Sequence, residues 1–486
     1  MTTHSDHHPT REDRRKAGQA CRNKVSRISQ GKFDPKARKF DPVEILRRAH
    51  EGRVHELLPL KFARMAETPF TFYRGAAPLM AADLAQLPRT GIDVQICGDA
   101  HVQNLGAYGG GADGHLIFDI NDFDETIRGP WEWDVKRMAA SLVLAGREAR
   151  NSERQCKDAV MCFSRTYRET MRDLSELSVI ELARYQVMRH LKVSPVLSVL
   201  RKAEHATPQS TLQKLGVEKD GKYTIKELID PTFGIPVQYR VPDSMAKKVL
   251  AALPGYVETL LSERHHFFHQ YHPADVAFRV VGTGSVGTRD YVVLMFAGAV
   301  EDPLFLQLKQ ELPSAYSKYL PDSHPPKHHG ERVVDGVRRM LVQYDIFMGW
   351  ATIEGRPYLV RQLKDHKAGI ESTDLEGKGV LQYAEVCGEL LAKGHARSGD
   401  PCMLSGYLGT ADRFDNALVN FAVDYADQDT RDFEKLLKAI RAGIVEGLKP
   451  VAKPAATKKK KSQAKKKAPA QAKSKGKRKK RAHSKG

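Results

Sequence analysis

The sequence predicts a mixed α+β fold of two lobes followed by a disordered tail, and three observations carry this prediction. Residues 41–277 and 371–448 show mostly helical periodicity, and we expect them to form and complete one helical lobe. Residues 278–370 contain short alternating apolar runs typical of strands, and we expect a β lobe there. Both ends, residues 1–40 and 449–486, are polar, basic and without sustained periodicity. The chain of 486 residues is long enough to bury a core in each lobe.

The N-terminal segment, residues 1–40, is expected to be a disordered or extended arm. Order is predicted to begin near Asp41, because Pro42 is placed to open a helix that extends to Leu58.

The C-terminal tail, residues 449–486, is a predicted polycation. It holds 17 of the lysine and arginine residues and no acid, so the preceding part of the chain is nearly neutral. Its Lys, Arg, Ala, Pro and Ser cannot bury enough apolar surface to fold. Such a tail binds DNA, RNA, polyphosphate or an anionic surface through counterion release, without recognising a sequence. The alternative is a solubilising appendage.

Composition also indicates the compartment. The six cysteines show no paired spacing typical of a metal site and are expected to be reduced thiols. No apolar run is long enough for a membrane span, and the first 15 residues lack the apolar core of a secretory signal. These features predict a cytoplasmic protein without a membrane span.

The stretch from Ile96 to Leu142 carries the strongest signal for chemistry. Asp99, His101 and Asn104 follow an apolar run that ends at Ile96. The spacing D-x-x-x-x-N from Asp99 to Asn104 is typical of phosphoryl-transfer sites, where the acid lies beside the attacking hydroxyl and the amide binds a metal. Asp99 and His101 are therefore the candidate catalytic residues.

A second run, residues 115–120, alternates as a half-buried strand after a glycine-rich turn and delivers more carboxylates. Asp122 is the favoured partner of Asn104 in a Mg²⁺ site, and Asp119 and Asp124 are possible substitutes. Gly129 and Pro130 then open a helix. The simpler alternative is an ordinary turn, since Asp, Asn and Gly all favour turns.

The segment FRVVGTGSVGTRDYVVLMF contains a second motif. Gly282, Gly284 and Gly287, with Ser285 between them, form G-x-G-x-x-G between two predicted strands. A dinucleotide-binding fingerprint would require a helix after the glycines, whereas a glycine loop between antiparallel strands, then Lys309 on a third strand, is the arrangement with which kinases cover a nucleotide. The acid expected to orient this lysine is Glu331 or Glu311.

Arg74 lies between Tyr73 and Gly75 in an otherwise apolar stretch. Its guanidinium is a candidate phosphate contact, and a structural ion pair is the alternative.

Two resemblances follow from these motifs. GDAHVQN, FDINDFDE, PWEWDVKRMAASL, VGTGSVGTRDY, LQLKQE and GELLAKGHARSGD together resemble the bacterial family called domain of unknown function 2252, over roughly residues 40–445, which implies no activity. Separately, GDAHVQN with DFDETIRGPWEWD is similar to motifs of aminoglycoside and choline phosphotransferases, which have the protein-kinase-like fold. Cys97 replaces the first histidine of that pattern.

The second resemblance implies that Asp99 is the base and that Asn104 and Asp122 bind Mg²⁺. It implies that Asp134 supports the loop, and that the three glycines and Lys309 hold the phosphates of ATP. In kinases the glycine loop precedes the catalytic loop, whereas in this sequence it follows by about 180 residues. We therefore expect a circular permutation.

The resulting prediction is an ATP- and Mg²⁺-dependent transfer of phosphate to a hydroxyl acceptor that the sequence does not specify, with nucleotidyl transfer also compatible. One alternative is a metal-dependent phosphohydrolase or nuclease that uses Asp99, His101, Asp119, Asp122 and Asp124. The other is a protein that binds nucleotide or nucleic acid without catalysis.

Overall fold

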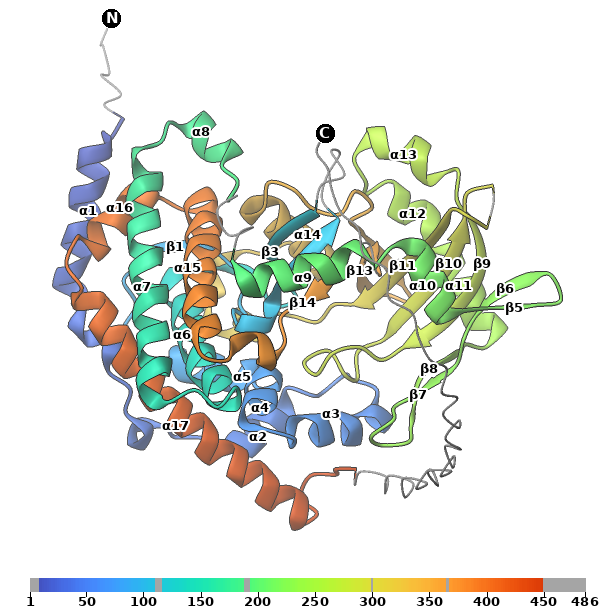
Figure 1. Ribbon diagram of the computed structural model, residues 1–486, viewed down its shortest axis with the longest axis horizontal. Coiled ribbons are helices and arrows are strands. Elements are labelled where there is room, and N and C mark those ends of the chain that lie inside the picture. Colours follow the sequence, from blue (N-terminus) through green and yellow to red (C-terminus); the bar gives the residue numbers. More distant parts are fainter. Residues whose placement is uncertain (1–7, 110–115, 188–192, 299, 364–366, 449–486) are drawn as a thin grey trace, which may run out of the picture. The chain divides into compact units, whose positions relative to one another are not determined.

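The computed structural model describes residues 8–109, 116–187, 193–298, 300–363 and 367–448 (Figure 1). These residues belong to one compact unit. The predicted basic tail, residues 449–486, lies outside the described residues.

The largest sheet has seven antiparallel strands in the order β12-β13-β11-β10-β9-β8-β7. Its strands are β7 (Leu228–Ile229), β8 (Pro236–Arg240), β9 (His272–Arg279), β10 (Asp290–Phe296), β11 (Pro303–Gln310), β12 (Gly349–Ile353) and β13 (Arg356–Gln362). The mixed α+β fold that the sequence predicts is therefore confirmed. The sheet begins well before residue 278, so the predicted start of the β lobe is too late. The short strands β7 and β8 gave little alternating signal.

Both faces of this sheet are covered. Successive residues of a strand point to opposite faces, and on β10 Val293 belongs to one apolar cluster while Val292 belongs to another. The cluster with Val293 is closed by α11 (Asp243–Ala251), α12 (Leu253–Val257) and α13 (Ser262–Phe268). The other is closed by α10 (Pro208–Leu215) and the hairpin of β5 (Gly216–Lys219) and β6 (Lys222–Ile225).

Long helices build the second apolar core, with α7 and α15 side by side in Figure 1. They are α6 (Trp131–Glu148), α7 (Glu153–Glu176), α15 (Lys378–Ser398), α16 (Pro401–Leu408) and α17 (Arg413–Arg441). The backbones of α7 and α15 approach closely because position 388 is glycine. A Cβ there would lie 2.6 Å from the carbonyl oxygen of Phe163. Within the described ranges, none of the helices is both long and apolar enough to cross a membrane.

The prediction of a disordered N-terminal arm is wrong for residues 8–40. They contain α1 (Arg11–Lys24), whose first turn is closed by a capping box between Thr10 and Asp13. This helix packs on α16, where a Cβ on Gly18 would lie 1.9 Å from the carbonyl oxygen of Met403. Periodicity did not predict this helix, because it lacks an apolar stripe. Its contacts are instead made by a glycine and by arginine side chains that donate to carbonyl oxygens, such as Arg22 Nε to the Tyr407 oxygen at 2.9 Å.

Short helices connect these parts of the chain. They are α2 (Pro42–Arg48), α3 (Leu58–Met65), α4 (Pro69–Gly75), α5 (Ala77–Leu84), α8 (Val179–Arg184), α9 (Ser194–Glu204) and α14 (His329–Met340).

Two small sheets position the predicted site. Strand β1 (Asp93–Ile96) pairs with β4 (Ile127–Pro130), and β2 (Leu105–Gly109) pairs with β3 (Leu116–Ile120), which also confirms the predicted hairpin. Strand β14 (Ala368–Gly369) adds to β2. Because β1 pairs with β4 and β2 with β3, the β1–β2 and β3–β4 connections lie beside each other.

Candidate functional site

A polar cavity lies where the two predicted motifs meet. We call residues 97–104, between β1 and β2, the Asp99 loop, and residues 282–287, between β9 and β10, the glycine loop. Both line this polar cavity although about 180 residues separate them. Its predicted site residues are Arg74, Asp99, His101, Asn104, Asp122, Asp124, Gly282, Gly284, Ser285, Lys309 and Glu311.

The Asp99 loop is held by Asp134, in the first turn of α6. One oxygen of this buried carboxylate accepts the Cys97 N–H at 2.7 Å, and the other accepts the Gly98 N–H at 2.9 Å. Gly98 has φ +84°, a conformation that favours glycine. The support of the loop by Asp134 that the resemblance implies is therefore present as a contact.

Asp99 forms an ion pair with the buried Arg137. Arg137 Nε, on α6, donates to Asp99 Oδ1 at 2.6 Å, and its guanidinium lies 4.4 Å from the Tyr73 ring centroid. Burial raises the pKa of Asp99, although Arg137 opposes the shift. The Asp99 carboxylate is therefore fixed, and its affinity for a proton is raised.

His101 lies beside this carboxylate. Its Nε2 is 3.8 Å from Asp99 Oδ2, and its Nδ1 accepts the Gln103 N–H at 3.2 Å. Burial and the nearby charges of Arg74 and Arg137 hold the pKa of His101 well below its ordinary value. His101 is therefore a neutral imidazole that orients the loop.

Asn104 and the carboxylates that follow β3 form the other wall. Asn104 Nδ2 donates to the Asp99 carbonyl oxygen at 2.8 Å. This hydrogen bond uses the amide nitrogen and not the amide oxygen of Asn104. Asp122 Oδ1 accepts the Asp124 N–H at 3.3 Å. Burial, with the charge of Asp124, raises the pKa of Asp122. Together these oxygens are the donor type that Mg²⁺ prefers.

Lys309, on β11, joins the two halves of the polar cavity. Its ammonium forms an ion pair with Asp124 Oδ2, which also accepts a hydrogen bond from Ser285 Oγ at 3.1 Å. Burial alone would lower the pKa of Lys309, but Asp124 and Asp122 outweigh it and raise this pKa. The lysine is buried and remains charged.

Three predicted residues do not line the polar cavity: Glu331, Asp119 and Gly287, whose carbonyl oxygen accepts the Val54 N–H at 2.7 Å. The N–H of Glu331, at the start of α14, donates to His328 Nδ1 at 3.2 Å, and Lys309 is paired with Asp124 instead. Glu311, the other candidate, lines the cavity, and burial raises its pKa well above the ordinary value. Asp119 forms a buried ion pair with Lys393 of α15 and does not line the polar cavity.

The glycine loop is anchored by basic side chains that sequence analysis missed. Lys61 Nζ donates to the Thr283 oxygen at 3.1 Å, Arg53 Nη1 to the Gly284 and Val286 oxygens at 2.9 and 2.7 Å, and Arg64 Nη1 to the Gly282 oxygen at 2.6 Å. These cations cover carbonyl oxygens that would repel an anion. No periodicity or motif marked them, because their partners lie more than 200 residues away.

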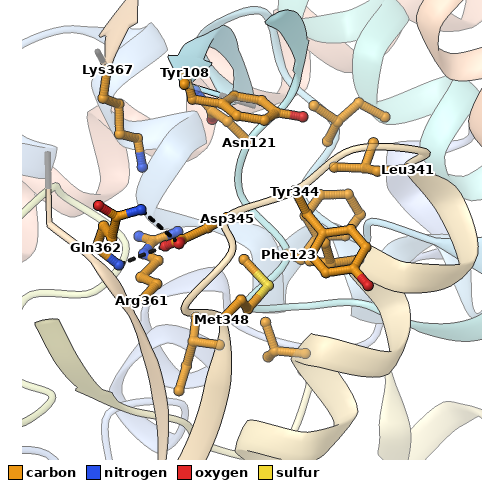
Figure 2. Close-up of a pocket in the computed structure, with 15 residues that line it drawn as sticks. Tyr108, Asn121, Phe123, Leu341, Tyr344, Asp345, Met348, Arg361, Gln362 and Lys367 are labelled. Carbon is orange, nitrogen blue, oxygen red and sulfur yellow. Dashed lines mark hydrogen bonds between the residues drawn. The ribbon is translucent and has the colours of Figure 1, made fainter. Parts of the chain in front are cut away.

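A second cavity is mostly apolar (Figure 2). Tyr108, Phe123, Leu341, Tyr344 and Met348 gather on one side, whereas Arg361, Gln362 and Lys367 form a polar end. Asp122 lines the polar cavity, and its neighbours in sequence, Asn121 and Phe123, line the apolar one. Burial and the charge of Arg361 lower the pKa of Lys367 to about 7.

No group of three or more His, Cys, Asp or Glu side chains within the described ranges is arranged to hold a metal ion by itself. A cation at Asn104 and Asp122 would therefore need further oxygens from a ligand.

Comparison of the sequence with known protein families identifies the family of the chain. The model of a family described as an uncharacterized protein conserved in bacteria, DUF2252, matches residues 53–439. The chain belongs to this family. The match to DUF2252 spans both motifs, the anchoring residues Arg53 to Arg64, and the helices through α17. No curated protein and no solved structure matches the chain.

Proposed function

We propose that this DUF2252 protein is an ATP- and Mg²⁺-dependent phosphotransferase that acts on a hydroxyl acceptor. The observation that carries the proposal is the assembly of one polar cavity from the glycine loop, Lys309, Asp99, Asn104 and Asp122. These residue types are the ones that phosphoryl transfer requires for phosphate binding, metal binding and orientation of a hydroxyl. Sequence order does not bring them together, so their convergence in space is independent support.

The glycine loop and Lys309 would bind the phosphates. The Lys309 ammonium is held between Asp124 and the loop, in reach of a phosphate that takes the place of part of that ion pair. Asn104 and Asp122, with Asp124, would hold Mg²⁺, which supplies neutralisation of phosphate charge when bound. The apolar cavity offers an aromatic and aliphatic lining for a nucleobase.

Asp99 would orient the acceptor and take its proton. The oxygen of the acceptor hydroxyl bonds to the γ-phosphorus, and the bond from phosphorus to the bridging oxygen breaks with its electron pair staying on ADP. The hydroxyl proton passes to the Asp99 carboxylate. The raised pKa of Asp99 supports this role, and Arg137 keeps the side chain in position.

A permuted kinase-like arrangement is part of this proposal. Strands β9, β10 and β11, then α14, β12 and β13, follow one another in the order strand, glycine loop, strand, lysine strand, helix, strand, strand. A kinase small lobe has this order, with the Asp99 loop expected after it. In this chain that loop precedes the sheet, which is what a circular permutation would produce.

The metal-dependent hydrolase receives less support. It requires the Asp/His cluster to hold two metals, but Asp119 is occupied by Lys393 and three metal-binding side chains do not converge in the described residues. It also leaves the glycine loop and Lys309 without a role.

Nucleotide titration of the full-length protein tests the proposal. Thermal shift and calorimetry would follow ATP binding with and without Mg²⁺ in the wild type, Lys309→Met and Asp122→Asn. We expect Mg²⁺-dependent binding that both variants weaken by about a hundredfold, the loss of one charge-assisted contact in a buried site.

Matched controls are Lys327→Met and Asp322→Asn, both exposed and outside the cavity, which should bind as the wild type does. The basic tail is common to all five proteins, so its attraction for ATP cancels. Absence of binding in the wild type, or equal binding by all five, would refute the proposed function.

A further inference from the structure

We infer that the acceptor is a small hydroxylated anion whose carboxylate or phosphate group binds Arg74. This inference rests on the proposed function and specifies the class of the second substrate.

Arg74 differs from the other cations that line the polar cavity. Lys309 is paired with Asp124, and Arg53 and Lys61 donate to carbonyl oxygens of the glycine loop. The side chain of Arg74, at the end of α4, makes no hydrogen bond or ion pair with any residue that the structure describes, and its Nε is buried. Arg74 is half-buried and lines the polar cavity, and a guanidinium partly withdrawn from water without a partner is unfavourable, so a ligand anion is its natural partner.

The neighbours of Arg74 place this anion on the acceptor side. The carbonyl oxygen of Arg74 lies 3.5 Å from the position of a Cβ built on Gly284, so α4 ends against the tip of the glycine loop. After its own burial, the strongest influence on the pKa of Arg74 is the charge of Asp99, the proposed base. Yet Asp99 is held by Arg137, so it does not neutralise Arg74.

The nucleotide phosphates already have cations and amides of their own. Lys309 and the glycine loop belong to the sheet, whereas Arg74 belongs to α4, whose Phe70 ring lies 6.2 Å from the ring of His101 in the Asp99 loop. A guanidinium presents several N–H donors in one plane and matches the two oxygens of a carboxylate or phosphate. An acceptor with an anion at Arg74 would hold its hydroxyl close to Asp99.

A second polar atom without a partner lines the same cavity. His50 is buried, and its Nδ1 makes no hydrogen bond within the described structure. Burial keeps the pKa of His50 far below its ordinary value, so the ring is neutral and can donate one hydrogen bond without adding charge. The residues between His50 and Pro78 also close this side of the cavity, which favours a small molecule over a protein segment as the acceptor.

The test measures anion binding to the nucleotide complex. Full-length protein would be saturated with Mg²⁺ and the non-hydrolysable β,γ-imido analogue of ATP, and then titrated with inorganic phosphate or acetate at constant ionic strength. Binding of the analogue is measured first, so a failure of the proposed function is seen in that titration and is distinguishable. Calorimetry would compare the wild type with Arg74→Met and Arg74→Lys.

The control variant is Arg338→Met. It also removes a guanidinium whose Nε is buried and without a partner, but it lines neither cavity. We expect one anion site in the wild-type complex that Arg74→Met weakens by at least about tenfold, that Arg74→Lys retains in part, and that Arg338→Met leaves unchanged. Affinity for the nucleotide analogue should change by less than about threefold in Arg74→Met, because other groups bind the phosphates.

Three outcomes would overturn the inference. The first is a wild-type complex that binds neither phosphate nor acetate more tightly than chloride. The second is an Arg74→Met variant with undiminished anion binding. In the third, Arg74→Met weakens the nucleotide analogue as much as the anion, which would assign Arg74 to the phosphates of ATP.

Discussion

Replacing Asp134 with asparagine should destabilise the protein by an amount that its hydrogen bonds predict. The buried carboxylate accepts the N–H groups of Cys97 and Gly98, one on each oxygen. A hydrogen bond to a charged group contributes about 1.5–3 kcal/mol, and a buried donor without an acceptor costs about 1–3 kcal/mol. An amide offers one oxygen and turns an NH₂ group toward the second N–H. We therefore expect Asp134→Asn to lower the free energy of unfolding by about 2–4 kcal/mol.

Urea denaturation followed by circular dichroism would measure this loss. The matched control is Asp335→Asn on α14, whose side chain is 40% exposed and lies 3.7 Å from Arg339. Exposed ion pairs contribute little, so the control should change stability by less than about 0.5 kcal/mol. If Asp134→Asn unfolded within about 0.5 kcal/mol of the wild type, the loop would not depend on Asp134 as the contacts imply.

Three further predictions concern backbone, charge and tail. Gly98→Ala should lower the free energy of unfolding by about 2–4 kcal/mol in the same urea assay, because Gly98 has a positive φ and its Cβ would lie 2.3 Å from the Glu125 carbonyl oxygen. The control is Gly221→Ala. Gly221 also has a positive φ but has open space around it, so this variant should lose only about 1 kcal/mol. Burial raises the pKa of Asp290 from 3.8 to about 7, so the folded state binds this proton more tightly and stability should fall as pH rises from about 4 to 7. In melting curves at pH 5 and pH 8, Asp290→Asn should show a smaller fall than the wild type, and an equal fall would contradict the assignment. Truncation after Leu448 should abolish DNA binding that weakens steeply with salt in a filter-binding assay, and DNA binding that survives truncation would refute the electrostatic tail.

The structural elements around the candidate site that the sequence predicted correctly are local in the chain. The alternation of β3 and the start of α6 after Pro130 each depend on neighbours within a few residues. Strand periodicity and helix-opening residues act over that range, so the Asp99 loop and its hairpin could be located without coordinates.

The errors concern contacts between distant segments. Asp119 and Asp122 have similar sequence contexts. Only the fold shows that Asp119 pairs with Lys393 of α15 and does not line the polar cavity. Likewise, nothing near Lys309 indicates that Asp124 is its partner, since 185 residues separate them. Charge pairing over such distances depends on tertiary packing, which local patterns do not encode.

The contact between α1 and α16 has a consequence for biosynthesis. Helix α1 is translated long before residues 401–408, the segment on which it docks. Before α16 is translated, α1 cannot make its contact with that helix. Asp134 likewise lacks its contact with His395, whose Nε2 lies 3.3 Å from Asp134 Oδ2 in the folded protein. Such long sequence separations slow folding and prolong the exposure of incomplete cores. The nascent chain is therefore expected to depend on chaperones until α16 has emerged, and a chain that ends before residue 401 should leave its own N-terminal helix accessible to proteases.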